Sequence, residues 1–186
     1  MLIYSILRAT CAATTIIAGE TEYNIRKLTT DDVKKPEFIC LFGELTTTDE
    51  TTEEVIVKTF ERKEASGLHH QLGLFTSDGT VVGTLTVLLD PKYAKNGRPA
   101  AFIEDVIVAE KHRGKELATY LMKEAEDIST KNGAYKMILS CNEALSTKET
   151  SPYLKSGFTK DCCTMRKNLK KEEKAEEEAA KMEVSD

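Results

Sequence analysis

The chain has 186 residues, 40% of them hydrophobic, which is enough to bury one good core and short for two independent ones. Its formal net charge is −5, and the segment 170–186 carries most of it, with seven acidic residues against four lysines. The rest of the chain is close to neutral. Because the composition shows no basic surface, we expect no nucleic-acid partner.

The cysteines are odd in number and show none of the paired spacings of a zinc site or a disulfide framework. They are Cys11, Cys40, Cys141, Cys162 and Cys163. This pattern favours a reducing compartment. We therefore expect a cytoplasmic protein without a bound metal.

The N-terminal run MLIYSILRATCAATTIIAGE is apolar enough to suggest a signal peptide or a membrane anchor. Arg8 interrupts this run, however, and no basic segment precedes it. The favoured interpretation is a poorly ordered extension or an edge strand, with targeting or anchoring as the alternative. We assign residues 1–22 to this extension.

A strand and two helices are predicted next. The run YNIRKL alternates apolar and polar residues as a strand does, and the TTDD that follows is a helix-capping pattern. The first helix has apolar residues at roughly helical spacing: Val33, Ile39, Phe42 and Leu45. The second helix begins at Thr52 with two glutamates in its first turn. Its predicted buried face consists of Val55, Ile56 and Phe60.

Strands dominate the centre of the chain. The run QLGLFTSDGTVVGTLTVLL reads as a β-hairpin with its turn at residues 77–79. The loop DPKYAKNGRPAA leads to a strand that contains Ile103, Val106 and Val108. A short basic turn then begins a helix, which Gly133 ends. The apolar positions of this helix are Leu117, Leu121, Met122, Ala125 and Ile128.

The C-terminal part predicts a strand at YKMILSC, a polar loop to Ser151, a short helix at PYLKSGF and a last strand near CCTMRKNL. The tail, residues 170–186, has good helix formers but almost no apolar stripe, so it is a solvated helix or disordered. The order of elements predicts one α/β (α+β) domain over residues 23–169, with helices on both faces of a mixed sheet.

The turn KHRGKELA, residues 111–118, is the first candidate site. A strand that enters a helix through a short turn with glycine leaves backbone N–H groups at the positive end of the helix dipole, where they bind phosphate or pyrophosphate. Arg113 and Lys115 add positive charge, and Ala118 is small enough for a ligand to lie against the helix. Considered alone, the turn fits a solvated surface turn equally well.

The wider pattern resembles a known family. The runs IEDVIV, HRGKELATYL, NGAYKMILSC and PYLKSGF together resemble the GNAT superfamily of acetyl-CoA-dependent N-acetyltransferases, and within it the glucosamine 6-phosphate N-acetyltransferases. The superfamily motif Arg/Gln-x-x-Gly-x-Gly/Ala is similar to RGKELA here, with Glu116 in place of the middle glycine. The resemblance covers about residues 23–169. It implies the GNAT fold, a central, mixed, mostly antiparallel twisted sheet with helices on both faces.

The resemblance also implies roles for individual residues. Acetyl-CoA, the co-substrate, would lie against one strand and the turn after it: Val106, Ile107, Val108, Arg113, Gly114, Lys115, Glu116, Leu117 and Ala118. The aminosugar phosphate would meet Thr46, Lys92, Lys95, Glu104 and Asp105. Catalysis would fall to Glu104, Asp105 and Tyr153, whose hydroxyl would face the departing thiolate. A purely structural role is the alternative for each, and it is weakest for the two adjacent carboxylates.

The chain departs from the family at several acceptor positions. Ser140 stands where the family has an acidic residue before Cys141, Lys95 replaces a histidine, and Asn168 replaces a basic residue. The loop 142–151 is also longer. The acetyl group would pass directly to the amine, so Cys141 is interpreted as a core residue and not as a nucleophile.

Three functions therefore stay open. The first is acetylation of glucosamine 6-phosphate in UDP-N-acetylglucosamine synthesis, by a homodimer as in the family. The second is a GNAT enzyme with another amine acceptor. The third is a catalytically weak protein that binds the coenzyme and pairs with an active relative.

Overall fold

The computed structural model describes residues 13–46, 48, 51–161 and 164–167. Six strands form one sheet in the order β1-β2-β3-β4-β5-β6. Neighbouring strands are antiparallel except β5 and β6, which are parallel, so the sheet is mixed and mostly antiparallel as predicted. The strands are β1 Thr14–Ala18, β2 Thr21–Lys27, β3 His69–Thr76, β4 Val81–Pro91, β5 Pro99–Val108 and β6 Lys136–Leu139.

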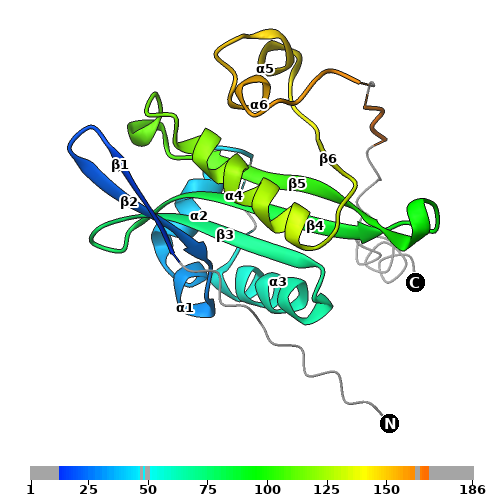
Figure 1. The fold of residues 1–186 in the computed structure, drawn as a ribbon. Coiled ribbons are helices and arrows are strands. Elements are labelled where there is room, and N and C mark those ends of the chain that lie inside the picture. Colours follow the sequence, from blue (N-terminus) through cyan, green and yellow to red (C-terminus); the bar gives the residue numbers. More distant parts are fainter. Residues whose placement is uncertain (1–12, 47, 49–50, 162–163, 168–186) are drawn as a thin grey trace, which may run out of the picture.

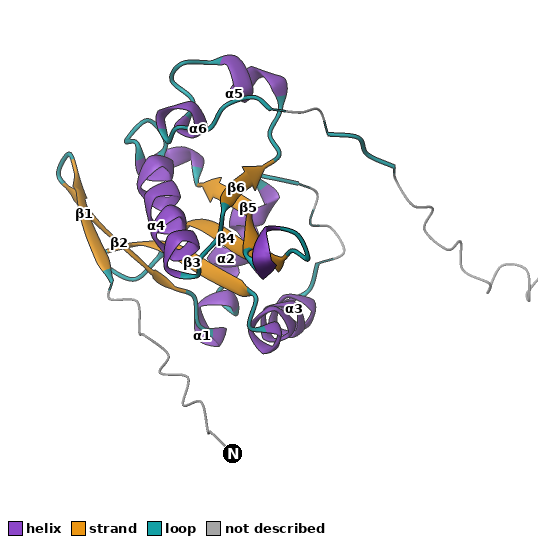
Figure 2. Cartoon of the chain, turned by 45° about the vertical axis from the view of Figure 1, so that its right-hand side comes forward, coloured by secondary structure: helices purple, strands orange, loops and turns teal. Residues whose placement is uncertain are grey.

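Helices cover both faces of the sheet (Figures 1 and 2), which confirms the predicted layers. The longest helix, α4, packs on one face with the larger apolar core. The helices α1, α2 and α3 pack on the opposite face with a second core that includes Phe60 and Ile107. The α-helices are α1 Thr30–Val33, α2 Pro36–Gly43, α3 Glu53–Ser66, α4 Leu117–Lys131, α5 Glu143–Thr147 and α6 Pro152–Lys155. Two short 3-10 helices complete the described elements: η1 Lys95–Gly97 lies between β4 and β5, and η2 Glu110–His112 lies between β5 and α4.

The first predicted helix is two helices in the structure. The chain leaves the helical conformation before Pro36, which has no backbone N–H and starts α2 at its first position. The break turns the second helix relative to the first, so the buried residues are Val33, Phe38 and Leu41. Ile39 is only partly buried and Leu45 is exposed. In α3, Phe60 is buried as predicted, whereas Val55 is half exposed.

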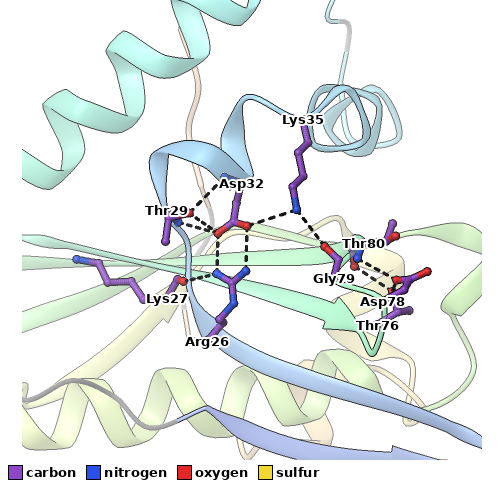
Figure 3. A network of polar contacts seen from close by, with 9 residues as sticks. All are labelled: Arg26, Lys27, Thr29, Asp32, Lys35, Thr76, Asp78, Gly79 and Thr80. Carbon is purple, nitrogen blue, oxygen red and sulfur yellow. Dashed lines mark hydrogen bonds and ion pairs between the residues drawn. The ribbon is translucent and has the colours of Figure 1, made fainter.

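A polar network fixes α1 against the sheet (Figure 3). Arg26 on β2 donates two hydrogen bonds to the carboxylate of Asp32, at 2.6 and 2.9 Å. The same carboxylate accepts from the backbone N–H and the hydroxyl of Thr29, the residue that caps α1. Burial alone would raise the pKa of Asp32, but these hydrogen bonds outweigh it and lower the pKa to about 2. The network holds the first turn of α1 at the end of β2.

The strand β1 lies inside the predicted N-terminal extension and is the edge strand of the sheet, paired with β2, and an edge strand was one of the two structures expected there. The C-terminal part of the domain differs from the prediction in two places. The polar loop before Ser151 contains the helix α5. Residues 164–167 form no strand, although one was predicted there, while residues 162, 163 and the whole of the tail lie outside the described residues. No helix in the described ranges is both long and apolar enough to cross a membrane.

Candidate active site

The edge of β5 is open along its second half. The parallel strand β6 pairs with β5 only from Ala100 to Ile103, where Leu139 ends β6. Beyond that point, β5 continues to Val108 and, among the described residues, is paired only with β4. A strand edge presents unpaired N–H and C=O groups that an extended amide chain can join. Val106, Ile107 and Val108, the residues predicted to contact the pantetheine arm, lie on this segment.

A β-bulge interrupts β5 next to the open edge. The register with β4 shifts between Thr84 and Thr86, and Asp105 opposite them adopts φ 54°, in the left-handed region. The hydroxyl of Thr84 donates to the carbonyl of Asp105 at 2.8 Å and supports this conformation. As a result, Val106 packs with the core beneath α4, whereas Ile107 packs with the core beneath α1, α2 and α3.

The turn between β5 and α4 has the geometry of an anion site. Gly114 and Glu116 both have positive φ, 79° and 59°, and α4 begins directly after them with fifteen residues of aligned peptide dipoles. The free N–H groups at such a helix start attract negative charge. Leu117 is buried and Ala118 is partly buried at the first turn. The turn could therefore hold a pyrophosphate by its backbone.

The basic side chains of this turn also contact the protein. The guanidinium of Arg113 donates to the carbonyl of Val108 at 2.8 Å and to a carboxylate oxygen of Glu44 at 2.7 Å. The ammonium of Lys115 lies 3.0 Å from the hydroxyl of Tyr23, a fully buried residue of β2. These contacts hold the turn in place and leave both cations beside the start of α4.

Glu116 connects the turn to α6. Its left-handed conformation is one that glycine adopts freely and other residues adopt at a cost, which explains why a glycine is usual at this place in the motif. The carboxylate of Glu116 forms an ion pair with Lys155, and this hydrogen bond lowers the pKa of Glu116. Lys155 is the last residue of α6, so the ion pair links the turn to the helix that carries Tyr153.

Tyr153 is partly buried and packs against the core beneath α4. Burial, and then the nearby thiol of Cys141, raises the pKa of its hydroxyl above the ordinary value. The hydroxyl therefore stays protonated at neutral pH and can donate a hydrogen bond or a proton. The same residue also has the packing role that was the structural alternative for it.

A cavity of about 260 Å³ lies on the opposite face of the sheet, beneath α2 and α3. Thr46 and Asp105, two residues predicted to meet the acceptor, both line it. Its wall is largely apolar and includes Phe38, Phe42 and Phe60. The sheet contributes a polar side with the side chains of Gln71, Thr84, Thr86 and Asp105.

The two lysines that were predicted to meet the acceptor lie away from the cavity. Lys92 and Lys95 are in the β4–β5 turn, at the far end of β5 from its open edge, and neither is among the described residues that line the cavity. Lys92 pairs with Asp90 and lies over the ring of Phe102. At about 3.3 Å per residue, the six residues from Pro99 to the bulge span roughly 20 Å, so a single chain does not bring these lysines to the cavity.

Three further positions bear on proton transfer: Glu104, Ser140 and Glu143. Glu104, beside the bulge, is exposed, and partial desolvation followed by the charge of Asp105 raises its pKa. The raised pKa makes this carboxylate a somewhat better base. Ser140 follows β6 directly and is exposed, with its hydroxyl 3.4 Å from that of Thr164. Glu143, the nearest acid in sequence, pairs with Lys160 at 3.3 Å.

Most of the cavity lining was not predicted from the sequence, including the polar residues Thr84, Thr86 and Lys63. Thr84 and Thr86 are polar residues at alternate positions of an otherwise apolar strand, and this period of two was a readable signal for a polar patch on one face. Lys63 follows Phe60 by three positions in α3, so it lies on the same helix face and reaches the cavity. To predict that Lys63 lines the cavity, one would have to know which helix covers the bulge.

Comparison with known proteins gives consistent results. Residues 36–158 match the model of the acetyltransferase (GNAT) family. Two curated relatives are named glucosamine 6-phosphate N-acetyltransferase. The Arabidopsis thaliana protein is 34% identical over 122 residues, which are 64% of this chain and 81% of the relative. The Trypanosoma brucei brucei protein is 29% identical over 129 residues, 69% of this chain and 85% of the relative.

Solved structures show the same fold. The glucosamine-6-phosphate N-acetyltransferase of Arabidopsis thaliana superposes with a TM-score of 0.72 at 31% identity, covering 80% of this chain and 99% of that one. A predicted acetyltransferase of Clostridium acetobutylicum, solved with acetyl-CoA, shares the fold with a TM-score of 0.62 at 18% identity, covering 79% and 96%. The family match covers most of the chain, and the open β5 edge and the turn before α4 agree with it. The chain therefore belongs to the acetyltransferase (GNAT) family.

Proposed function

We propose that this protein transfers the acetyl group of acetyl-CoA to the amine of glucosamine 6-phosphate. One observation carries the proposal: the open edge of β5 separates two half-sites on opposite faces of the sheet. The turn before α4 and Tyr153 lie on one face, and the cavity lined by Asp105 lies on the other. A thioester on one side and an amine on the other would meet at this edge. The names of the curated relatives support this acceptor.

The proposed coenzyme site uses backbone more than side chains. The N–H groups of residues 114–118 would hold the pyrophosphate, with Arg113 and Lys115 adding positive charge. Main-chain groups of residues 106–108 on the open edge would hydrogen-bond the amides of the pantetheine arm, except the Val108 carbonyl, which already accepts from Arg113. An N–H group of this edge would also stabilise the oxyanion that develops on the thioester carbonyl, by about 2–4 kcal/mol for a well-placed donor.

The acceptor amine must lose a proton before it attacks, because most of it is protonated at neutral pH. Asp105 lies in the cavity and would orient the ammonium by its charge. Glu104, with its raised pKa, is the carboxylate best suited to take up the proton. Ser140 cannot do so, since a hydroxyl does not accept a proton near neutral pH.

Tyr153 would act on the leaving group. A donor with a raised pKa stays protonated, so it can give a hydrogen bond or a proton to the sulfur as the C–S bond breaks. The acetyl group would pass directly from sulfur to nitrogen. Cys141 is exposed, so its interpretation as a core residue was wrong; we assign it no covalent role.

We further propose that the protein acts as a homodimer in a reducing, cytoplasmic compartment, in UDP-N-acetylglucosamine synthesis. A partner subunit would bring its own β4–β5 turn, with Lys92 and Lys95, to the site that a single chain leaves without them. The tail after Leu169 is not needed for this contact. Sedimentation of a chain that ends at Leu169 tests the claim, because a monomer there beside a full-length dimer would assign the interface to the tail.

A second candidate is a GNAT enzyme with a different amine acceptor. The apolar wall of the cavity and the hydroxyl at Ser140 favour it. Thiol release from acetyl-CoA, measured with glucosamine 6-phosphate, glucosamine, polyamines and lysine-containing peptides, decides between the two. A kcat/KM at least tenfold higher for another amine would remove glucosamine 6-phosphate as the acceptor, and no release with any amine would leave only a coenzyme-binding role.

A further inference from the structure

The cavity beneath α2 and α3 contains an ion pair between two residues that are 42 positions apart. The ammonium of Lys63 on α3 lies 2.8 Å from a carboxylate oxygen of Asp105 at the bulge. The hydroxyl of Thr86 lies 3.4 Å from the same oxygen. The two charged side chains are 27% and 30% exposed, so both still reach solvent at the mouth of the cavity.

These two residues are the only charged ones among the described residues that line the cavity. The remainder of the lining is apolar or carries hydroxyl and amide groups. Lys63 therefore supplies the positive charge on this wall and Asp105 the negative charge. An ion pair that stays partly exposed is weak, because solvent screens it and two long side chains must be ordered to hold it. Its members can exchange partners at little cost.

We infer that Lys63 binds the anionic group of the acceptor, and that the Lys63–Asp105 pair opens when the acceptor enters. This inference rests on the proposed function. Asp105 would then pair with the acceptor ammonium and Lys63 with its phosphate. The exchange favours an acceptor that carries both charges, since a phosphate monoester at neutral pH has nearly two negative charges where Asp105 has one. The flexible four-carbon stem of lysine allows the ammonium to move from one partner to the other.

The charges in the cavity also indicate which acceptors should bind less well. An amine without an anionic group would pair with Asp105 but would offer Lys63 no anion in place of the carboxylate that it loses, so it gains one charged contact where an aminosugar phosphate gains two. Lys63 is therefore a specificity-determining residue for a zwitterionic acceptor such as an aminosugar phosphate.

The test compares two acceptors that differ only in the phosphate, glucosamine 6-phosphate and glucosamine, at saturating acetyl-CoA. Lys63→Met should raise the KM for glucosamine 6-phosphate about 10–100-fold, in the range expected for one lost charge-assisted contact, and leave the KM for glucosamine unchanged or lower. Lys63→Arg keeps the charge and should retain most of the preference. The matched control is Lys58→Met on the same helix, because Lys58 pairs with Glu54 on the exposed side.

Equal changes in KM for both acceptors, or no change for either, would overturn the inference. A melting temperature measured for each variant excludes unfolding, and Lys63→Gln replaces the Met variant if that one fails to fold. If the unaltered protein turns over another amine but not glucosamine 6-phosphate, the proposed function fails separately. Calorimetry then decides the assignment: binding of glucosamine 6-phosphate that is lost in Lys63→Met upholds the anion site, and no binding overturns it.

Discussion

Charge reversal in the turn before α4 is the most direct perturbation of the proposed coenzyme site. Lys115→Glu changes a cation that lies beside the free N–H groups of the helix start and contacts the hydroxyl and the ring of Tyr23. Arg113→Glu changes a second cation, but it also places a carboxylate next to Glu44, which Arg113 now pairs with at 2.7 Å. The single Lys115 variant is therefore the cleaner probe of binding. The double variant shows the full electrostatic effect.

The magnitude follows from the number and exposure of the contacts. A charge-assisted hydrogen bond to phosphate contributes about 1.5–3 kcal/mol, and the Arg113 side chain is 53% exposed and already shared with Glu44, which places its contribution at the low end. We expect the double reversal to weaken coenzyme A binding by about 2–4 kcal/mol, roughly 30–1000-fold in Kd. Lys115→Glu alone should weaken it by about 1–2 kcal/mol.

Isothermal titration with coenzyme A measures these changes. Lys131→Glu is the control, since it makes the same charge change at the other end of α4, about 20 Å away and beyond the Debye length at physiological salt. Acetylpantetheine, which lacks the pyrophosphate, should be turned over equally well by the Lys115 variant and the unaltered protein. Unchanged affinity for coenzyme A in the double variant would refute the pyrophosphate assignment, and so would an equal loss of activity with acetylpantetheine.

Three further outcomes are expected. If glucosamine 6-phosphate is the acceptor, Ser140→Asp should raise kcat by roughly 10–10³-fold by restoring a carboxylate that can orient and deprotonate the amine; an unchanged rate in an already fast enzyme would show that none is required. Tyr153→Phe keeps the packing and should lower kcat by about 10–10²-fold with little effect on the KM for acetyl-CoA, and an unchanged kcat would remove the hydroxyl from the reaction. The free energy of unfolding, measured with urea at a series of pH values, should fall by about 2 kcal/mol between pH 5 and pH 2, because the pKa of Asp32 is about 2 in the folded protein against an ordinary value of 3.8, and its contribution is lost as the carboxylate is protonated. Asp32→Asn should remove this part of the pH dependence, and a pH profile identical to that of the unaltered protein would exclude Asp32 as its source.

The sequence by itself determined most of the local structure. At the turn after β5, the spacing of the apolar residues changes from every second residue, as in a strand, to the 3.6-residue period of a helix. This change placed the end of the strand and the start of α4. Thr52 caps α3, and the hairpin turns at residues 77–79, because these residues satisfy backbone groups within a few positions of themselves. Such patterns are readable because the interactions that cause them are local. The motif at residues 113–118 predicted the turn before α4 for the same reason.

The tertiary structure alone decided how the parts of the site meet. No local pattern gives the place where β6 stops pairing with β5, the bulge at Asp105, or the contact of that residue with Lys63, because each depends on register and packing between segments far apart in the chain. The same is true of the separation of Lys92 from the cavity. A strand has two edges and two faces, and only the neighbours that fold against it determine which edge stays open and which face borders the cavity.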